Sequence, residues 1–395
     1  MLLFYIYNVM YYNLNGNYIQ PGAACNQTWQ NRPAVKLKAS PCKTMHTKWL
    51  KFNMLHNRWY QPPFSAIIMQ GLTYLLNIFQ EEKMRKGISK NVVILWTLVL
   101  IVFSLTIVPD AFAQVGLRKI ADNVYVYADI KGGSPSNSFG ANAGIVVGKD
   151  SILVIDTLIS SKEAKRFIKD IRAISDKPIK YVVNTHYHLD HTFGNSEFEK
   201  LGAVIISHAS CKKNMEKSAE GTLKNVKAFG LTEKDMEGTK IAYPALTFQD
   251  RIEIDLGGQK VELSYAGIAH TDDSILAYVH DKQVLFTGDI LFTEYHPFIA
   301  DGSIGEWVNV LDYIRTLDFK KIIPGHGPIS GRHDLLEMKE YIMAFDKKAK
   351  ELSAKSNDAD SIATEIKKEL PERPEGAGLI KSNIQMKYLK APSNP

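Results

Sequence analysis

The stretch 184–192, Asn-Thr-His-Tyr-His-Leu-Asp-His-Thr, decides the fold of this chain. It follows the run 179–183, Ile-Lys-Tyr-Val-Val, whose β-branched and aromatic residues predict a buried strand. The stretch carries four ligand-type side chains: His186, His188, Asp190 and His191. In an extended backbone the first two project to the same side, and the last two lie just past the turn. Because zinc prefers imidazole and carboxylate ligands, the stretch predicts a metal site at a strand end.

Three further motifs follow apolar, strand-like runs. They are Ala269-His270-Thr271-Asp272-Asp273, Phe286-Thr287-Gly288-Asp289 and Pro324-Gly325-His326-Gly327. The order His-x-His-x-Asp-His, then a single His, then Gly-Asp and then Gly-His-Gly resembles the metallo-β-lactamase superfamily. The resemblance covers roughly residues 117–333. It is specific because four separated elements agree in order and spacing.

The resemblance implies a ligand set for two zinc ions per chain, with iron as the other candidate metal. One zinc would be held by His186, His188 and His270, a second by Asp190, His191 and His326, and Asp289 would bridge the two. Asp156 matches another acidic position of the family, where it would orient a ligand or the metal-bound water, although a strand-end turn also explains an aspartate there. The remaining histidines of this region are interpreted as structural: His208, His280, His296 and His333.

Hydrolysis is the reaction that such a site favours. Two zinc ions can share a hydroxide and polarise an ester, thioester, lactone or lactam-type bond of a small-molecule substrate. Asp190 is the expected catalytic residue, as both a ligand and a proton acceptor. By resemblance, Asp289 is typical of glyoxalase II and of broad hydrolase branches, whereas class B1 β-lactamases have a cysteine there and a lysine three residues later. Here the later position is Phe292, which weakens a β-lactamase assignment without excluding it.

The stretch 288–303, together with Trp307, resembles exported zinc hydrolases of the quinoprotein-relay and sulfur-oxidation type. Within it Tyr295, His296 and Phe298 either line the pocket mouth or pack an ordinary loop. Three alternatives to a broad hydrolase remain open. They are a β-lactamase or lactonase, a mononuclear iron enzyme resembling persulfide dioxygenases, and a non-catalytic metal-binding protein.

The N-terminal part differs in composition from the rest. The first 80 residues contain no Asp or Glu, although about a quarter of the residues in a globular domain are charged. A basic segment begins at Met84, an apolar run covers 92–108, and small residues at 111 and 113 are typical of a signal peptidase site. We predict a signal peptide over 84–113, hence a periplasmic or secreted protein, and interpret 1–83 as a non-native upstream extension. The rival hypothesis is a genuine extension anchored in the membrane by 92–108.

Charge and cysteine content fit an exported small-molecule enzyme. Of 48 Lys and Arg and 42 Asp and Glu, 11 and 3 precede Gln114, which leaves 37 and 39 and a formal net charge of −2. Such a chain lacks the basic surface of nucleic-acid-binding proteins, so we expect no nucleic-acid partner. We expect membrane contact only transiently, through the signal segment. Beyond Gln114, Cys211 is the single cysteine, so no intramolecular disulfide is predicted there.

Alternating strand-like and helical segments predict an α+β fold in two similar halves. Helical spacing of apolar residues covers 161–175 and 305–317, and short β-rich runs precede each ligand motif. With the family resemblance, this pattern implies a four-layer αββα sandwich over 114–370. The polar, lysine-rich stretch from Cys211 to about Lys240 is expected to be either a lid or a solvated helix. Proline and glycine predict a loose C-terminal tail over 371–395.

Overall fold

The computed structural model describes residues 116–128 and 130–389. These residues belong to one compact unit, Pro109–Pro395. The predicted extension over 1–83 and the predicted signal peptide over 84–113 lie outside the described residues. Among the helices of the described part, none is both long and apolar enough to cross a bilayer.

The ligand stretch belongs to a seven-stranded sheet, whose spatial order follows the chain. Its first four strands pair antiparallel and the next three join in parallel. The strands are β1 Arg118–Ala121, β2 Val124–Tyr127, β3 Ala143–Val147, β4 Ile152–Ile155, β5 Ile179–Val183, β6 Val204–His208 and β7 Leu246–Phe248. The predicted meander and the predicted strand before the ligands are therefore confirmed.

The second sheet has five strands in the order β12-β11-β10-β9-β8. All neighbours pair antiparallel except β11 and β12, which are parallel. The strands are β8 Arg251–Asp255, β9 Lys260–Tyr265, β10 Ile275–Val279, β11 Val284–Phe292 and β12 Lys321–His326. Since the β11 and β12 strands run in the same direction, the Gly-Asp and Gly-His-Gly motifs come side by side.

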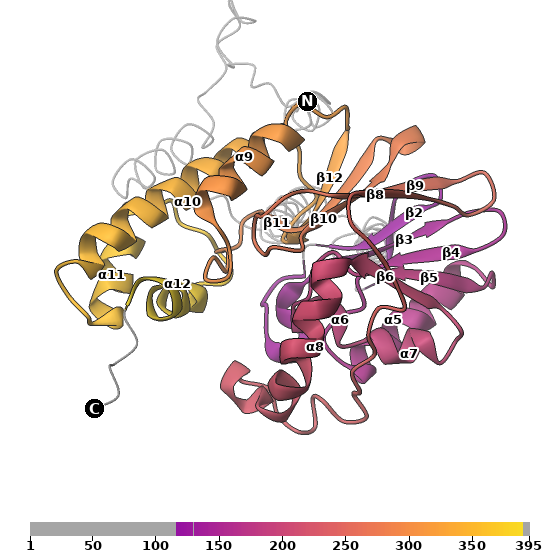
Figure 1. The fold of residues 1–395 in the computed structure, drawn as a ribbon, viewed down its shortest axis with the longest axis horizontal. Coiled ribbons are helices and arrows are strands. Elements are labelled where there is room, and N and C mark those ends of the chain that lie inside the picture. Colours follow the sequence, from indigo (N-terminus) through magenta and orange to yellow (C-terminus); the bar gives the residue numbers. More distant parts are fainter. Residues whose placement is uncertain (1–115, 129, 390–395) are drawn as a thin grey trace, which may run out of the picture. The chain divides into compact units, whose positions relative to one another are not determined.

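Helices cover the outer face of each sheet (Figure 1). The α-helices of the described residues are α5 Ser161–Ile174, α6 Leu189–Thr192, α7 Asn195–Glu199, α8 Ala209–Lys224, α9 Ile304–Ile314, α10 Arg332–Ser353, α11 Ala359–Glu369 and α12 Gly378–Asn383. Of these, α11 packs on α10 and α12 packs on α11 (Figure 1). Neighbouring strand residues face opposite layers: Ile145 packs with Phe167 of α5, while Val146 packs with Leu263 of the other sheet. On the far side Trp307 of α9 and Met338 of α10 cover the second sheet. This arrangement confirms the predicted αββα sandwich.

The C-terminal segment differs from the prediction. The predicted loose tail over 371–395 is wrong for residues 371–389, because α12 is followed there by a π-helix, Ile384–Tyr388. Residues 390–395 lie outside the described residues. Ile380 and Ile384 are buried in the cluster that includes α10 and α11, and each fully buried isoleucine contributes roughly 1.5–3 kcal/mol. The buried Arg373 also donates hydrogen bonds to the carbonyl oxygens of Phe292, the last residue of β11, and of Tyr295. These contacts outweigh the local preference of proline and glycine for irregular chain.

Candidate metal centre

The seven predicted ligands lie on strands, on one short helix and in the connecting segments between strands, and they meet at one site. His186 and His188 follow β5 directly, and the short helix α6 carries Asp190 and His191. His270 stands between β9 and β10, Asp289 lies within β11, and His326 ends β12. The carboxyl ends of parallel strands are a common place for such sites in α/β proteins.

The glycines of the downstream motifs allow the backbone to approach the ligands closely. Gly288 has a φ of +49° and packs against Thr185, a backbone conformation that side-chain-bearing residues rarely adopt. A Cβ atom at Gly325 would overlap the Asp289 carboxylate. Gly325 therefore lets β12 lie against Asp289 and brings His326 to the site.

The structure brings all seven side chains into two groups whose ligand atoms lie within 4.8 Å of one another. Group one consists of His186, His188, His270 and Asp289, and group two of Asp190, His191 and His326. These are the two sets that the resemblance implies. Their side chains are buried except for that of His188, which is partly exposed.

Asp289 lies between the two groups. Its Oδ2 is 3.3 Å from His270 Nε2 and 3.7 Å from His186 Nε2. Its Oδ1 is 3.1 Å from His191 Nε2 and 3.5 Å from His326 Nε2. One carboxylate oxygen thus faces each group, as the predicted bridging role requires.

The atoms that face the centre fit metal cations. The Nε2 atoms of His186 and His191 and the Oδ1 of Asp289 are buried and have no hydrogen-bond partner. Buried polar atoms left without partners are costly. A divalent ion in group one would satisfy His186 Nε2, and a second ion in group two would satisfy His191 Nε2 and Asp289 Oδ1. Three to four nitrogen and oxygen donors per group match what zinc takes in proteins.

Most of the histidines are oriented through the ring nitrogen that faces away from the centre. His191 Nδ1 lies 2.9 Å from Asp156 Oδ2, and His270 Nδ1 lies 2.9 Å from the carbonyl oxygen of Phe298. His188 Nε2 lies 2.9 Å from Asp301 Oδ2. Such partners fix the tautomer and the ring orientation of a ligating histidine. The interpretation of Asp156 as an orienting residue agrees with this geometry.

Asp156 holds two parts of the ligand stretch at once. Besides His191, it accepts hydrogen bonds of 2.8 Å from both the main-chain nitrogen and the hydroxyl of Thr185. Its φ of +60° lies in the left-handed region, which asparagine tolerates better than most residues. Asp156→Asn therefore removes the charge and keeps the backbone geometry.

We expect Asp156→Asn to weaken zinc binding by group two about 10- to 100-fold, because His191 loses its anionic partner. Group one, which has no contact with the Asp156 carboxylate except through Thr185, should change much less. Competition with a chromophoric chelator measures the two affinities. Equal weakening of both groups, or of neither, would contradict the role assigned to Asp156.

The two groups differ in protonation. Burial lowers the pKa of His186 and, to about 3, that of His270, so both imidazoles are neutral at pH 7. Burial has the same effect on His326, but Asp289 and Asp190 outweigh it and raise its pKa to about 9. His191 is likewise held protonated by the surrounding carboxylates, which raise its pKa well above the ordinary value. Without metal, His191 and His326 of group two therefore hold protons that His186 and His270 of group one lack.

Because a metal must displace those protons, we expect the zinc affinity of group two to fall as the pH falls. The loss is about tenfold per pH unit for each proton displaced, and it applies below the raised pKa of His326. His186 and His270 contribute no such dependence to group one. Stepwise affinities measured between about pH 6 and pH 8 check this. A steeper dependence in group one would contradict it.

The other histidines lie outside the two groups. His208 accepts a hydrogen bond from Ser210 at the start of α8 and stacks on Tyr265 at 4.3 Å between ring centroids. His296 Nδ1 lies 2.5 Å from the hydroxyl of Tyr341. His280 pairs with Glu262 at the surface, and His333 is exposed. A structural interpretation fits all four.

Of the three residues expected at the pocket mouth, two lie against ligands. The Tyr295 ring is 4.8 Å from that of His326, and the Phe298 ring is 5.7 Å from that of His188. His296 points instead to the α10 side. Asp301 was not identified as a site residue from the sequence, because it lies in an irregular loop and meets His188 across 113 positions of the chain.

The first half of the lysine-rich stretch belongs to the helix α8, with Cys211, Met215 and Ala219 buried, and the second half contains a 3-10 helix, Val226–Phe229. This agrees with a connecting helix, although one face is packed rather than solvated. Asn214 on this helix donates to Asp272 at 2.7 Å and to Asp273 at 3.2 Å. Both acceptors follow His270, so α8 is tied to a segment that carries a predicted ligand.

Comparison with known proteins supports the same reading of the centre. Residues 137–326 match the family model of the metallo-beta-lactamase superfamily. The chain is 28% identical to a linear primary-alkylsulfatase of Pseudomonas sp. (strain ATCC 19151), over 49% of this chain and 43% of that protein. It is 22% identical to a metallo-beta-lactamase type 2 of Bacillus cereus, over 58% of this chain and 83% of that protein.

A third relative is an acyl-coenzyme A thioesterase of Homo sapiens, 23% identical over 50% of this chain and 77% of that protein. The chain therefore spans less than half the length of the alkylsulfatase and most of the length of the other two. The shared region includes every predicted ligand, since the family model covers Asp156 through His326.

Proposed function

Because the chain belongs to the metallo-beta-lactamase superfamily, we propose that it is an exported binuclear zinc hydrolase. Its substrate would be a small molecule with an ester, thioester, lactone or lactam-type bond. The observation that carries the proposal is the set of buried, unpartnered ligand atoms in both groups, with Asp289 between them. The relatives that act on thioesters and alkyl sulfates by name support hydrolysis as the reaction class.

Groups one and two would each hold one zinc ion, and Asp289 would contact both. Such an ion pair lowers the pKa of water toward neutrality and polarises the bond to be cleaved. The protein itself supplies the orientation of the ligands, through Asp156, Phe298 and Asp301, and a largely buried site. Fixed ligands reduce the reorganisation that the reaction requires.

Asp190 is the residue we assign to proton transfer. Its Oδ2 lies 3.3 Å from His326 Nε2 and 3.6 Å from His191 Nε2. Burial raises the pKa of Asp190, but the two imidazoles outweigh burial and hold it below the ordinary value. The carboxylate is therefore ionised at neutral pH and able to accept a proton at the centre.

Phe292 argues against a β-lactam as the preferred substrate. Its side chain is buried, and its ring stacks on that of His326 at 5.1 Å with an interplanar angle of 1°. An apolar, packed side chain at this position offers no cation for a drug carboxylate. An uncharged or differently anchored ester, thioester or lactone fits better.

The proposed export depends on the segment Met84–Ala113, which has the basic, apolar and small-residue order of a signal peptide. N-terminal sequencing of natively expressed protein tests it. A first residue near Gln114 supports export by this signal. A chain that keeps residues before Met84 would contradict both the signal peptide and the non-native origin of 1–83.

The reaction class is tested by a substrate panel of aryl esters, thioesters, lactones and a chromogenic cephalosporin. We expect turnover of at least one ester or thioester, its loss after chelation and its return with added zinc. Rapid turnover of the cephalosporin or a lactone alone would select the lactamase or lactonase alternative. Oxygen consumption with a persulfide, by protein that contains iron, would select the dioxygenase alternative and contradict the proposal.

A further inference from the structure

Two of the three histidines in group one depend on a single loop, residues 297–302. The carbonyl oxygen of Phe298 lies 2.9 Å from His270 Nδ1. Three residues later Asp301 Oδ2 lies 2.9 Å from His188 Nε2 and accepts a hydrogen bond of 2.8 Å from the Tyr187 hydroxyl. The position of this loop therefore sets the orientation of both rings.

His188 has the greatest need for such support. Its side chain is 14% exposed, whereas the other four histidines of the two groups are 4% exposed or less. Close packing holds the buried rings on all sides, but a partly exposed ring keeps rotamer freedom that a hydrogen bond must restrict. Phe298 and Asp301 provide the contacts of His188 on the loop side.

The loop is held in turn by the C-terminal helices. Asn383 donates to the carbonyl oxygen of Pro297 and accepts from the main-chain nitrogen of Ile299, both at 2.8 Å. These two bonds bracket Phe298. The Asn383 side chain is buried, so both bonds are shielded from water.

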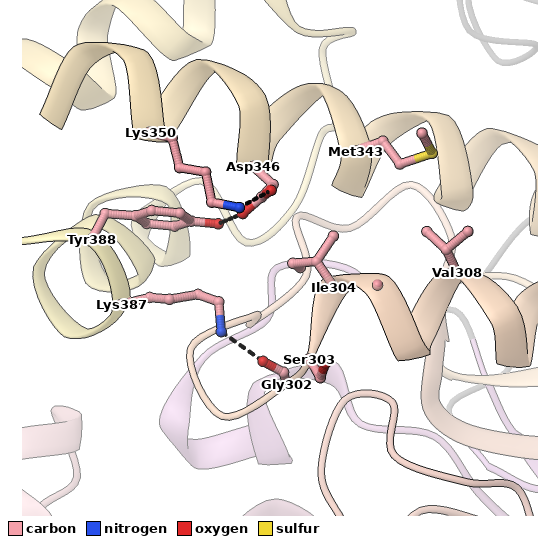
Figure 2. A pocket seen from close by; sticks show the side chains of 10 residues that line it. Gly302, Ser303, Ile304, Val308, Met343, Asp346, Lys350, Lys387 and Tyr388 are labelled. Carbon is pink, nitrogen blue, oxygen red and sulfur yellow. Dashed lines mark hydrogen bonds and ion pairs between the residues drawn. The ribbon is translucent and has the colours of Figure 1, made fainter. Parts of the chain in front are cut away.

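Lys387 makes the matching contact on the other side of the loop. Its ammonium donates to the carbonyl oxygen of Gly302 at 2.6 Å and to that of Ala300 at 3.4 Å. These bonds bracket Asp301. Figure 2 shows the Lys387 side chain extending from the C-terminal helix to Gly302, across a groove of about 800 Å³ between that helix, α9 and α10.

We propose that Asn383 and Lys387 form a two-point clamp that positions Phe298 and Asp301, and through them His270 and His188 of group one. Asn383 ends α12, and Lys387 lies four residues later in the π-helix Ile384–Tyr388. Residues four apart in a helix share a face, so both can reach one loop. A π-helix is rare and is found frequently at functional sites.

The clamp rests on the proposed function, because it matters only if group one binds a metal. Both residues are positioning residues, since neither contacts a ligand side chain directly. Their loss should leave group two unaffected, because none of the described hydrogen bonds of Asn383 or Lys387 reaches it. The clamp therefore predicts an effect confined to one of the two groups.

The first test replaces Lys387 with methionine, which keeps an unbranched chain and removes the ammonium. Lys350→Met is the matched control, because Lys350 lines the same groove and, within the part of the chain that the structure describes, pairs with Asp346 on its own helix and not with the loop 297–302. We expect Lys387→Met to weaken zinc binding by group one about tenfold, measured by chelator competition, with group two and the control unchanged. The electronic spectrum of the cobalt-loaded protein should change for Lys387→Met and stay the same for Lys350→Met.

The second test is Asn383→Asp, an isosteric change that removes the donor to Pro297 and places a carboxylate against its carbonyl oxygen. It should change the cobalt spectrum in the same way as Lys387→Met. Ser382→Ala, whose hydroxyl bonds only within α12, is the control. The melting temperature of each variant is measured beside its cobalt spectrum. If the spectrum changes only in variants that also have a lower melting temperature, and to a matching degree, Asn383 and Lys387 have a merely structural role and the clamp is overturned.

The outcomes separate this inference from the proposed function. Wild-type protein that binds no metal in either group contradicts the proposed function itself. Wild-type protein with two filled groups, together with equal behaviour of Lys387→Met and Lys350→Met, overturns the clamp alone. If Lys387→Met lowers the zinc affinity of both groups equally, the clamp is also overturned, because its effect would then not be transmitted through His188 and His270.

Discussion

Replacing His270 with alanine is expected to lower kcat/KM at least about 1,000-fold. His270 is completely buried, faces Asp289 Oδ2 at 3.3 Å and lies 2.9 Å from His188 Nδ1 through its Nε2. Removing it leaves group one with fewer donors and a cavity. A metal ion contributes several kcal/mol to transition-state stabilisation, and each 1.36 kcal/mol corresponds to a factor of ten in rate.

His208→Ala is the matched control for this prediction. His208 is also a buried histidine at a strand end, but its contacts are with Ser210 and Tyr265 and not with either group. We expect this variant to keep most of its activity and both metals. Steady-state kinetics and metal analysis compare kcat/KM and metal content between His270→Ala and His208→Ala. Equal losses of activity would mean that the ligand set is wrong.

Asp190→Asn is expected to lower kcat about 100- to 10,000-fold, the range that a general base contributes, while much of the metal stays bound. The asparagine oxygen keeps one donor for group two, and His191, His326 and the shared Asp289 remain. The variant loses the negative charge that accepts the proton. Activity should therefore fall much further than zinc content.

Asp312→Asn serves as the control, since Asp312 is a partly exposed carboxylate of α9 that pairs with Lys339 and lies outside both groups. We expect wild-type kinetics and metal content from it. For Asp190→Asn, unchanged turnover would reject the catalytic role. A complete loss of zinc from group two would reassign Asp190 as a ligand only.

The local sequence was sufficient to predict the strand and helix order around the site, and the family resemblance supplied the seven side chains that the structure brings together. Each ligand motif follows an apolar run, and the parallel pairing of β11 with β12 brings Asp289 and His326 together. The orienting role of Asp156 was also predictable, because the residue closes a strongly apolar strand. At these strands the local sequence pattern predicts the same structure that the tertiary contacts produce.

The sequence did not reveal the residues that act through tertiary contacts alone. Asp301 lies in a loop without periodicity, and its contact with His188 depends on how two distant loops pack. The segment after Pro371 contains proline and glycine, which locally predict irregular chain, yet Ile380 and Ile384 bury against α10 and α11. Asn383 and Lys387 acquire a role only because this packing places them beside residues 297–302.

The metal content of protein expressed from Met84 into a periplasm tests the central claim most directly. Elemental analysis per chain should give two zinc ions, and Asp156→Asn should weaken the zinc affinity of group two alone, by about 10- to 100-fold. That result would agree with both groups acting as zinc sites. A single iron per chain, or no metal after purification in the presence of zinc, would contradict the binuclear zinc centre.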